Sequence, residues 1–367
     1  MTVRAATIAD QAPWDDYVAT HPLGSPYHRY AWKEAMERAY GIETGYYLAE
    51  NIQGGIKGIL PAARLPRPLG TGAWCSLPYC DRGEPLANDR ETAEALAASL
   101  VCGDDAAGPT ANYEIRATGS DDDQPGGDDA QLAPGQKVRM LLDLPDTPDA
   151  LFKGFKSKHR SQINKARKNG LTVSLGNTPA AVEQFYAVYS ANMRDLGSPP
   201  HSRAWFHAVA SAYGDDCVIA LVSTGATVIG AGLVLANPVQ ATIPWASTLR
   251  DFNRLAPNLL LYWALLSHCI ERGCRRFDFG RSGYGEGTYR FKAQWGARAV
   301  PLAWRRYRPA GTGQPSNLPA ESARQDASQN TSKSAAHLRP LAEATWRRLP
   351  LPLTVAVGGR LRKYISL

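Results

Sequence analysis

The chain has 367 residues, and 44% of them are hydrophobic, which is enough for two domains of ordinary size with buried cores. The 41 Lys and Arg residues exceed the 34 Asp and Glu residues, and the resulting net charge of +7 permits an anionic partner without selecting one. No C-x-x-C pair occurs among the six cysteines, which excludes a zinc site of that spacing and indicates structural thiols in a reducing compartment.

The first half of the chain predicts a mixed α/β domain that ends at residue 137. Its helical and alternating patterns predict a strand at 3–8, helices at 9–20 and 28–40, strands at 46–50 and 56–65, a helix at 90–101 and a strand at 111–117. The next segment, 118–136, is dominated by Asp, Gly and Pro and has no periodicity. We expect it to be a disordered loop, and we expect its acidic run to be solvated and to hold no metal.

The second half, residues 138–309, predicts a second α/β domain with a clearer order of elements. The expected elements are a strand at 138–144, a helix at 149–169, a strand at 171–175, helices at 179–196 and 201–213, strands at 217–223, 227–236 and 240–246, a buried helix at 257–272, and strands at 276–280 and 299–307. Three meandering strands are therefore followed by a helix and a further strand.

The C-terminal part changes composition. Residues 310–340 are rich in Gly, Ser, Ala, Gln, Asn and Pro and predict a disordered linker. Residues 341–367 form a basic amphipathic tail, for which two interpretations stay open: packing on the body of the protein, or peripheral contact with an anionic inner-membrane surface. The first residues contain an early arginine and no apolar run, and the longest apolar run, near 259–266, is too short to span a membrane, so we expect a cytoplasmic protein.

The stretch from Phe277 to Gly296 is the most informative part of the chain. A short strand leads into a loop with glycines at 280, 283, 285 and 287, followed by an aromatic and basic turn. Glycine lets the backbone approach a ligand closely, so this loop predicts a binding site; a flexible surface hairpin is the alternative. The glycine spacing does not indicate a dinucleotide site, because no clear helix opens at the last glycine.

The segment DFGRSGYGEGTYRFKAQWGA, residues 278–297, resembles the signature of FemAB-like acyltransferases, in the branch associated with PEP-CTERM and exopolysaccharide systems. Three other segments agree with this resemblance: KSKHRSQINKARKNGLTV, NMRDLGSPPHS and PNLLLYWALLSHCIERGC. The resemblance covers roughly residues 1–308. It implies an α/β (α+β) fold of tandem GNAT-like domains, the acyl-CoA N-acyltransferase fold, facing a central cleft. The predicted meander, helix and further strand match this plan.

The resemblance implies an acyltransferase that moves an acyl or aminoacyl group from an activated carrier to an amine on a cell-envelope or polysaccharide precursor. No bound cofactor is expected, and the co-substrate would be aminoacyl-tRNA or acyl-CoA. The choice stays open, because there is no heptad stretch for the coiled-coil arm of some tRNA-dependent members, and the usual CoA phosphate loop is not visible at 249–258. The alternatives are an acyl-CoA-dependent acetyltransferase of a small amine and a catalytically silent binding protein at the membrane surface. No DNA-reading motif is present.

Acyl transfer requires a held donor, a deprotonated amine and a positive or N–H group beside the developing oxyanion. Lys292, in FKAQWG, resembles the Phe–Lys near Gly of FemAB-type transferases, where it would stabilise charge in the transition state; the alternative is a surface lysine. Asp278 is a candidate base or amine-orienting group, or else it pairs with Arg281. Tyr289 is a candidate donor to a carbonyl or a sugar, or else a packed aromatic.

Anion-binding residues are predicted in two places. Arg281 and Ser282 follow the strand directly, and an arginine suits a phosphate or carboxylate by its two-pronged geometry. The basic helix 153–168 suits a polyanionic donor, although a solvated face is equally consistent. Within that helix the family-like pattern favours Arg160 and Lys165.

Three further residues are expected at the site. His201 lies in a helix–helix break and is predicted to line the cleft as a base, to cap a helix or to lie on the surface. Asn258 and Tyr262 begin the buried helix and are expected to point at the cleft. No Ser-His-Asp or Cys-His order is apparent, so no covalent enzyme intermediate is expected.

Overall fold

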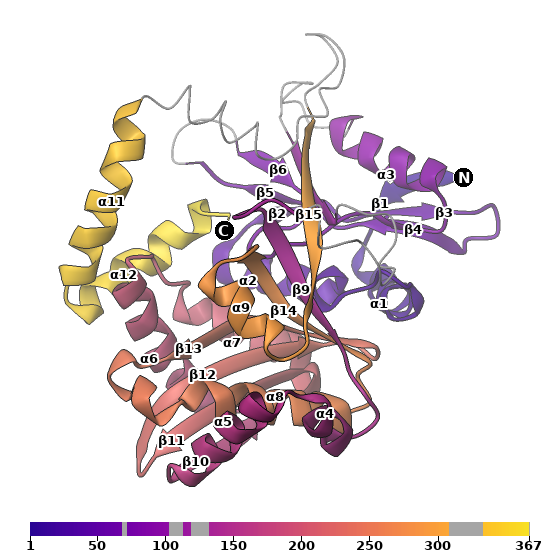
Figure 1. Cartoon of the computed structure of the whole chain (residues 1–367). Coiled ribbons are helices and arrows are strands. Elements are labelled where there is room, and N and C mark those ends of the chain that lie inside the picture. The colour runs from indigo at the N-terminus through magenta and orange to yellow at the C-terminus, as the bar shows by residue number, and fades with distance from the viewer. Residues whose placement is uncertain (68–71, 103–112, 119–131, 308–332, 367) are drawn as a thin grey trace. The chain divides into compact units, whose positions relative to one another are not determined.

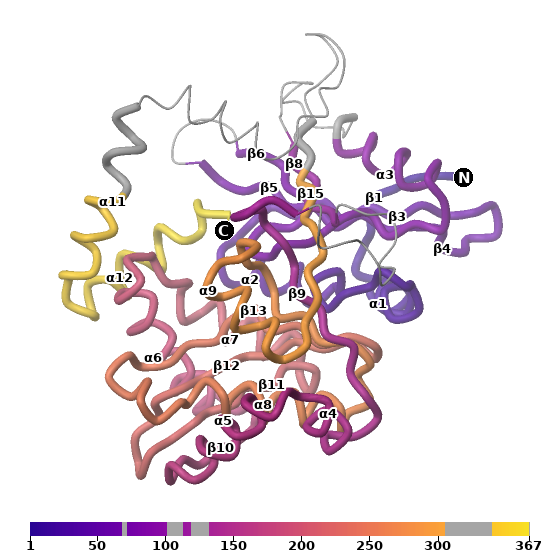
Figure 2. The backbone as a smooth tube through the Cα atoms, in the orientation of Figure 1, coloured from indigo at the N-terminus to yellow at the C-terminus, as the bar shows by residue number. Residues whose placement is uncertain are grey.

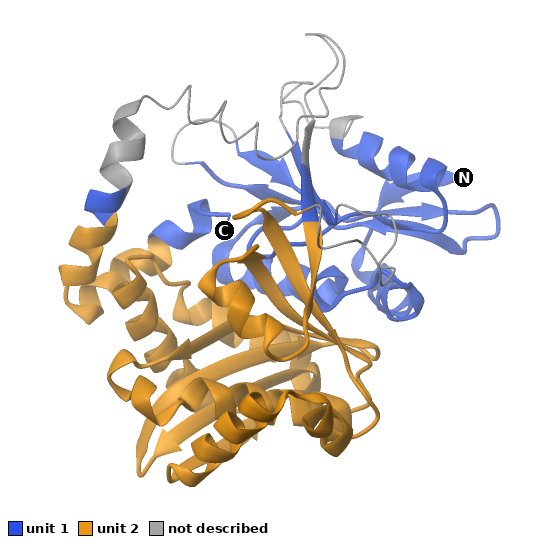
Figure 3. Ribbon diagram, viewed as in Figure 1, with its two compact units in different colours: residues 1–123, 302–342, 361–367 blue, residues 124–301, 343–360 orange. Residues whose placement is uncertain are grey.

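A computed structural model describes residues 1–67, 72–102, 113–118, 132–307 and 333–366 (Figure 1). The chain forms two compact units, whose backbone can be followed in Figure 2 and which are coloured separately in Figure 3. Unit 1 comprises residues 1–123, 302–342 and 361–367, and unit 2 comprises residues 124–301 and 343–360. The sequence predicted that one domain ends at residue 137 and the next begins at residue 138, and this boundary stays a prediction.

Unit 2 is built on a sheet with the strand order β10-β11-β12-β13-β14-β9-β15. The strands are β9 (Lys137–Asp143), β10 (Leu171–Gly176), β11 (Cys217–Thr224), β12 (Thr227–Ala236), β13 (Gln240–Thr248), β14 (Arg276–Gly283) and β15 (Arg298–Tyr307). Neighbours run antiparallel, except that β13 and β14 run parallel. Of β15, residues 298–301 pair with β9 in this unit and residues 302–307 pair with β8 in unit 1. The predicted meander followed by a helix and a further strand is confirmed.

Helices cover both faces of this sheet. They are α4 (Pro148–Gly154), α5 (Ser157–Lys168), α6 (Pro179–Leu196), α7 (Arg203–Tyr213), α8 (Pro257–Glu271) and α9 (Gly287–Ala293). Trp245 of β13 packs against Phe206 of α7, whereas Gly232 of β12 faces the leucines of α8. Trp245 is paired with Leu233, the residue after Gly232, and successive strand residues point to opposite faces. The helices α7 and α8 therefore lie on opposite faces.

The prediction of one continuous helix at 149–169 is wrong, because the structure has two helices there, α4 and α5. Phe155 lies between them with an extended backbone (φ −71°, ψ 150°). Its ring packs at 5.5 Å from Trp295 and 6.3 Å from Trp263, measured between ring centroids. Arg160 then donates from Nη1 to the carbonyls of Lys153 and Phe155, at 3.1 and 2.7 Å. Tertiary packing of one aromatic ring thus overrides a continuous helical pattern.

Unit 1 contains two groups of strands. The strands β1 (Thr2–Ala5), β3 (Tyr47–Glu50), β4 (Ile56–Leu60) and β7 (Leu86–Ala87) form an antiparallel sheet in that order. The strands β8 (Tyr113–Thr118), β6 (Ala73–Cys75), β5 (Ala63–Leu65) and β2 (Glu43–Thr44) are also neighbours in that order. The helices are α1 (Gln11–Thr20), α2 (Tyr30–Tyr40) and α3 (Arg90–Cys102). Short 3-10 turns are η1 (Ile8–Asp10), η2 (Pro26–His28), η4 (Gly214–Asp216), η5 (Arg250–Leu255) and η6 (Arg362–Tyr364), of which η4 and η5 belong to unit 2.

The C-terminal tail is helical, with α11 (Lys333–Arg348) and α12 (Leu351–Leu361). Most of the predicted linker and of the loop at 118–136 lies outside the described residues, but residues 333–340 belong to α11, which shortens the linker. In α12, Thr354 is fully buried, and Gly358 lies so close to Pro200 that an added Cβ would be 2.4 Å from the proline Cδ. The interpretation of a tail packed on the body therefore holds for residues 343–360, within unit 2.

In the part of the chain that the structure describes, each helix is too short or too polar to cross a lipid bilayer.

We predict that Gly358→Ala destabilises the docking of α12, because the new methyl group has to displace the Pro200 ring. Overpacking of this kind costs about 1–3 kcal/mol of unfolding free energy. Urea denaturation followed by tryptophan fluorescence measures the change. Gly154→Ala is the control, because nothing lies within 4 Å of its added Cβ. Equal stability of the two variants would contradict the close contact.

Candidate active site

The two parallel strands of unit 2 separate soon after they meet. Strands β13 and β14 are paired only at Gln240–Arg276, Ala241–Phe277 and Thr242–Asp278. Beyond this point β13 continues to pair with β12, and β14 continues to pair with β9. Pro244, in the part of β13 that has left β14, has no N–H to donate. Strands that part in this way at their carboxyl ends present edges to which an extended ligand can add.

A buried ion pair lies at the point of separation. Asp278 accepts a bond of 2.6 Å from Arg139 Nε on β9, and the two side chains are only 5% and 0% exposed. Its other carboxylate oxygen accepts from the backbone N–H of Gly280 at 2.8 Å. Arg139 also donates from Nη2 to Gln240 Oε1 on β13, at 3.3 Å. One guanidinium thus connects three neighbouring strands, and the alternative in which Asp278 pairs with Arg281 is wrong.

The register of β14 shifts immediately after the ion pair. The irregularity lies between Asp278 and Arg281, where Gly280 has a φ of +72°, a conformation that favours glycine. Lys292 Nζ donates to the carbonyls of Gly280 and Arg281, at 3.1 and 2.8 Å. Lys292 is 8% exposed, so the alternative of a surface lysine is wrong. These two bonds fix the position of the Lys292 ammonium beside the register shift.

The glycine-rich loop ends in a helix, which corrects a sequence expectation. Helix α9 begins at Gly287, the last glycine of the loop, and Arg290 Nε stabilises the turn before it by donating to the Gly285 carbonyl at 3.0 Å. Tyr289 is half-buried, with its ring centroid 4.8 Å from that of Tyr284. The arrangement still does not match a dinucleotide fold, because α9 has seven residues and is no crossover helix between parallel strands.

Two more predicted residues lie beside the register shift. Ser282 is 4% exposed, and its hydroxyl has no hydrogen-bond partner among the residues that the structure describes. Tyr262 of α8 stacks on Phe279 at 5.5 Å and meets Phe291 of α9 edge-on at 5.2 Å. Burial raises the pKa of the Tyr262 hydroxyl, so this residue is neutral and contributes an aromatic contact beside the register shift.

Four predicted residues are placed away from this cluster. Arg160 holds the end of α4, as described above, and Lys165 is exposed on α5. Asn258 is exposed in the first turn of α8. His201 is fully buried, with its ring stacked on Trp205 at 5.5 Å and its backbone N–H donating to Tyr189 Oη at 3.1 Å. It packs 5.8 Å from Trp245, on the α7 face of the sheet.

The sequence analysis did not single out Arg139 and Gln240, although they fix the site. The available signal was an arginine within the apolar strand VRMLL, residues 138–142, because a charge in such a strand requires a partner. Arg250 and Arg254 were also missed. Both are exposed in η5, which leads from the carboxyl end of β13 to the first turn of α8. The N-terminus of a helix carries backbone N–H groups that favour anions.

Comparisons with known proteins agree with this geometry. Residues 153–293 match the family model described as "Acetyltransferase (GNAT) domain". The fold is therefore GNAT-like. The matched segment includes α5, β13, β14 and the whole of α9, and thus the separated strands and Lys292. No curated protein matches the chain.

Solved structures extend the likeness beyond the matched segment. FemX has a TM-score of 0.63 and 13% identity, over 82% of this chain and 95% of that chain. A tandem GNAT protein from the clavulanic acid biosynthesis pathway has a TM-score of 0.52 and 16% identity, over 85% and 99%. The C-terminal domain of a putative lysylphosphatidylglycerol synthetase from Agrobacterium fabrum has a TM-score of 0.51 and 14% identity, over 81% and 91%. At these identities the likeness establishes the fold, a mixed α/β arrangement of GNAT type.

We predict that Asp278→Asn destabilises unit 2, because it leaves the buried Arg139 guanidinium without a charged partner. Breaking a buried ion pair costs about 3–5 kcal/mol. Urea unfolding gives the value. The matched control is Glu94→Gln, which breaks the exposed Arg90–Glu94 pair and should cost less than about 1 kcal/mol. The double variant Arg139→Met/Asp278→Leu should recover part of the loss. If Asp278→Asn costs no more than the control, the ion pair does not hold the strands.

Proposed function

We propose that this protein is a FemAB-like N-acyltransferase, which moves an acyl or aminoacyl group from an activated carrier to an amine on a cell-envelope or polysaccharide precursor. The observation that carries the proposal is the placement of Lys292 and Arg281 at the register shift of β14, where two parallel strands part within a GNAT-like fold. The resemblance of residues 278–297 to the PEP-CTERM-associated branch supports an exopolysaccharide-related or peptidoglycan-related acceptor.

The proposed reaction forms one bond and breaks one. The amine nitrogen attacks the carbonyl carbon of the donor, the new C–N bond forms, and the carbonyl oxygen becomes an oxyanion. The oxyanion collapses and expels the carrier as a thiolate or a ribose hydroxyl, while the nitrogen loses a proton. Lys292, held beside the register shift by the carbonyls of Gly280 and Arg281, stabilises the oxyanion with its positive charge. Tyr289 donates to a carbonyl or a sugar hydroxyl of a substrate.

Asp278 has a positioning role in this proposal. Both carboxylate oxygens accept hydrogen bonds, from Arg139 and from the Gly280 N–H, and the side chain is 5% exposed. A base has to reach the amine directly or through one water. The amine therefore loses its proton to solvent or to a group of the substrate. Arg281 and Ser282, directly after the shift, bind an anionic group of a substrate.

An acyl-CoA donor is supported by the polar groups at the start of α8. The helix begins after the carboxyl end of β13, and Arg250, Arg254 and Asn258 are exposed there. Two arginines and the first-turn N–H groups suit a pyrophosphate.

An aminoacyl-tRNA donor is supported by a different surface, the basic face of α4 and α5. Its exposed members are Lys153, Lys156, Lys158, Lys165, Arg167 and Lys168. A run of this kind follows a nucleic-acid backbone by contacts to several phosphates. The likeness to FemX extends over most of the chain and is consistent with either donor.

Peripheral membrane contact through residues 341–367 is part of the proposal. Leu341, Leu353 and Leu361 are 64%, 45% and 42% exposed, and Arg347, Arg348 and Arg360 are exposed beside them. Exposed leucines with adjacent cations suit an anionic lipid surface. The second candidate function, a silent binding protein at the membrane, rests on the same residues and requires no transfer.

We predict that calorimetry distinguishes the donors. If the donor is acyl-CoA, Arg250→Gln and Arg254→Gln each weaken acetyl-CoA binding by about tenfold, since each removes a charge-assisted hydrogen bond. Lys165→Gln and Lys168→Gln then leave it unchanged. If the donor is aminoacyl-tRNA, the α5 variants weaken the binding of a charged tRNA pool and reduce its salt dependence. No binding of acetyl-CoA, longer acyl-CoAs or charged tRNA would exclude both donors.

We predict that the variant Lys292→Met distinguishes the two candidate functions, an acyltransferase and a catalytically silent binding protein. Once the donor is known, we expect the variant to bind it normally but to lower the rate of transfer to an amine acceptor by about 10²-fold, as is typical for loss of one oxyanion donor. Circular dichroism and urea unfolding must show an intact fold. Arg290→Met, on the same short helix, is the control. Unchanged transfer by folded Lys292→Met would remove Lys292 from the chemistry.

A further inference from the structure

The carboxylate of Glu286 lies against the backbone of β14 at Gly283. A Cβ added to Gly283 would be 2.2 Å from the Glu286 Cδ and 2.4 and 2.5 Å from its two carboxylate oxygens. The φ angle of Gly283 is not positive, so the backbone itself does not require glycine at this position. The missing side chain of Gly283 therefore makes room for the carboxylate.

A tight turn folds Glu286 back over the strand. The Glu286 N–H donates to the Gly283 carbonyl at 3.0 Å, and Gly285, inside the turn, has a φ of +76°. The N–H of Tyr284, the other residue of the turn, donates to the Gln136 carbonyl at 2.8 Å. Backbone bonds thus set the place from which the Glu286 side chain extends.

This carboxylate has most of its hydrogen-bonding capacity left. It lies 3.8 Å from Lys137 Nζ, which is longer than the about 2.7–2.9 Å of a charge-assisted hydrogen bond. Its oxygens accept no hydrogen bond from the residues that the structure describes, and the side chain does not cap α9. The side chain is 54% exposed, so a solute can reach it.

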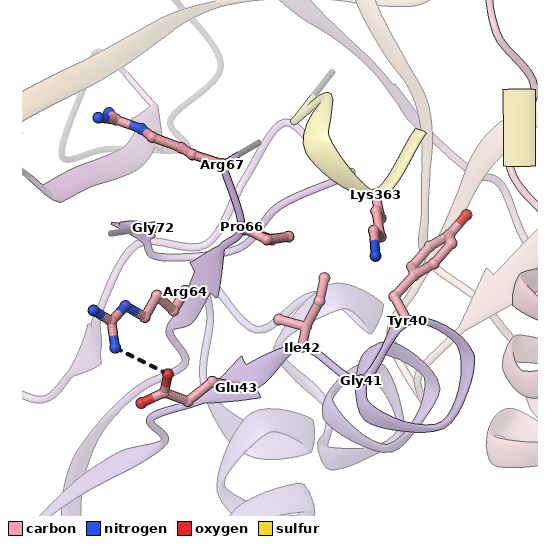
Figure 4. A pocket seen from close by; sticks show the side chains of 9 residues that line it. All are labelled: Tyr40, Gly41, Ile42, Glu43, Arg64, Pro66, Arg67, Gly72 and Lys363. Carbon is pink, nitrogen blue, oxygen red and sulfur yellow. Dashed lines mark hydrogen bonds and ion pairs between the residues drawn. The ribbon is translucent and has the colours of Figure 1, made fainter. Parts of the chain in front are cut away.

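A carboxylate of unit 1 shows the contrast. Glu43, beside a pocket of that unit, has a side chain that is 53% exposed, almost the same fraction as for Glu286. Figure 4 shows that it is already bonded to Arg64, whose Nη1 lies 3.1 Å from its Oε2. Glu43 is therefore satisfied by its own chain, whereas Glu286 is not.

The Glu286 carboxylate lies close to the group assigned to the oxyanion. Gly283 follows Arg281 by two residues, and the Arg281 carbonyl holds the Lys292 ammonium. Residues 281–283 pair regularly with β9, and a strand rises about 3.3 Å per residue, which puts the two places about 7 Å apart along β14. An acyl carbonyl beside Lys292 and an amine beside Glu286 fit such a distance, because each charge-assisted hydrogen bond takes up about 2.8 Å of it.

We propose that Glu286 binds the acceptor of the transfer reaction as a protonated primary amine. The inference rests on the function proposed above and adds the residue that selects the acceptor and the charge of that acceptor. The ammonium displaces Lys137 and donates to the carboxylate. It loses one proton to solvent, and the neutral amine then attacks as described above. The substrate class is an aliphatic amine that is cationic at neutral pH.

The test measures the acceptor kinetics of the full chain at neutral pH, with the donor that binds in calorimetry and with ethanolamine and lysine as acceptors. Glu286→Gln should raise the KM of these amines by about tenfold and leave kcat unchanged, since it removes one charge-assisted contact made before and during the reaction. The side chain caps no N–H of α9, so the helix does not depend on its charge.

Two further variants separate amine binding from a structural ion pair. Lys137→Met removes the competing cation, so KM should fall by about twofold, in keeping with the small energy of an exposed ion pair. If the ion pair only held the turn in place, Lys137→Met would raise KM as Glu286→Gln does. Glu43→Gln is the matched control, because it removes an equally exposed carboxylate from unit 1, and it should leave KM unchanged.

The outcomes distinguish this inference from the function on which it rests. If the wild-type chain transfers its donor group to neither amine, the proposed function fails and the inference fails with it. If the wild-type chain is active, three results overturn the inference alone: an unchanged KM in Glu286→Gln, a raised KM in Lys137→Met, or an equal rise of KM in Glu43→Gln.

Discussion

The buried ion pair between Arg139 and Asp278 is the constraint on which the rest of unit 2 depends. Two charges removed from water are tolerated only when their geometry and their remaining hydrogen bonds are well satisfied. Here the requirement is met by the Gly280 N–H and by Gln240. The pair therefore fixes three strands relative to one another at the position where β13 and β14 stop pairing.

The register shift follows from this anchor. Because the carboxylate of Asp278 binds the N–H two residues ahead, the chain turns at Gly280 and exposes two successive carbonyls to Lys292. The lysine is held by the backbone of the strand whose shape the ion pair determines. A cation placed by fixed dipoles needs little reorganisation when charge develops nearby. The same contacts also make Lys292 a structural residue, which is why rate and stability have to be measured separately.

The sequence predicted the helices and strands that have strong periodicity. It failed where contacts between residues that are far apart in the chain determine the local structure. The meander and α8 follow from local patterns, and the glycines that end α2 and α6 have positive φ angles of 61° and 78°, a conformation that favours glycine. The predicted helix breaks at Phe155 because this side chain packs against Trp263 of α8 and Trp295, which follows α9. Asp278 and its partner are 139 residues apart, so the nearer Arg281 was the only partner that spacing suggested.

The division of the chain has a consequence for biosynthesis. Unit 1 contains the first 123 residues, but β8 pairs with residues 302–307, and Tyr79 is bonded to residues 363 and 366. As the chain leaves the ribosome, residues 1–123 cannot complete these contacts until residues 302–307, 363 and 366 have emerged. Unit 2 can close most of its sheet earlier. During that interval the edge of β8 has no neighbour on one side, and exposed strand edges of nascent chains are what chaperones shield from aggregation.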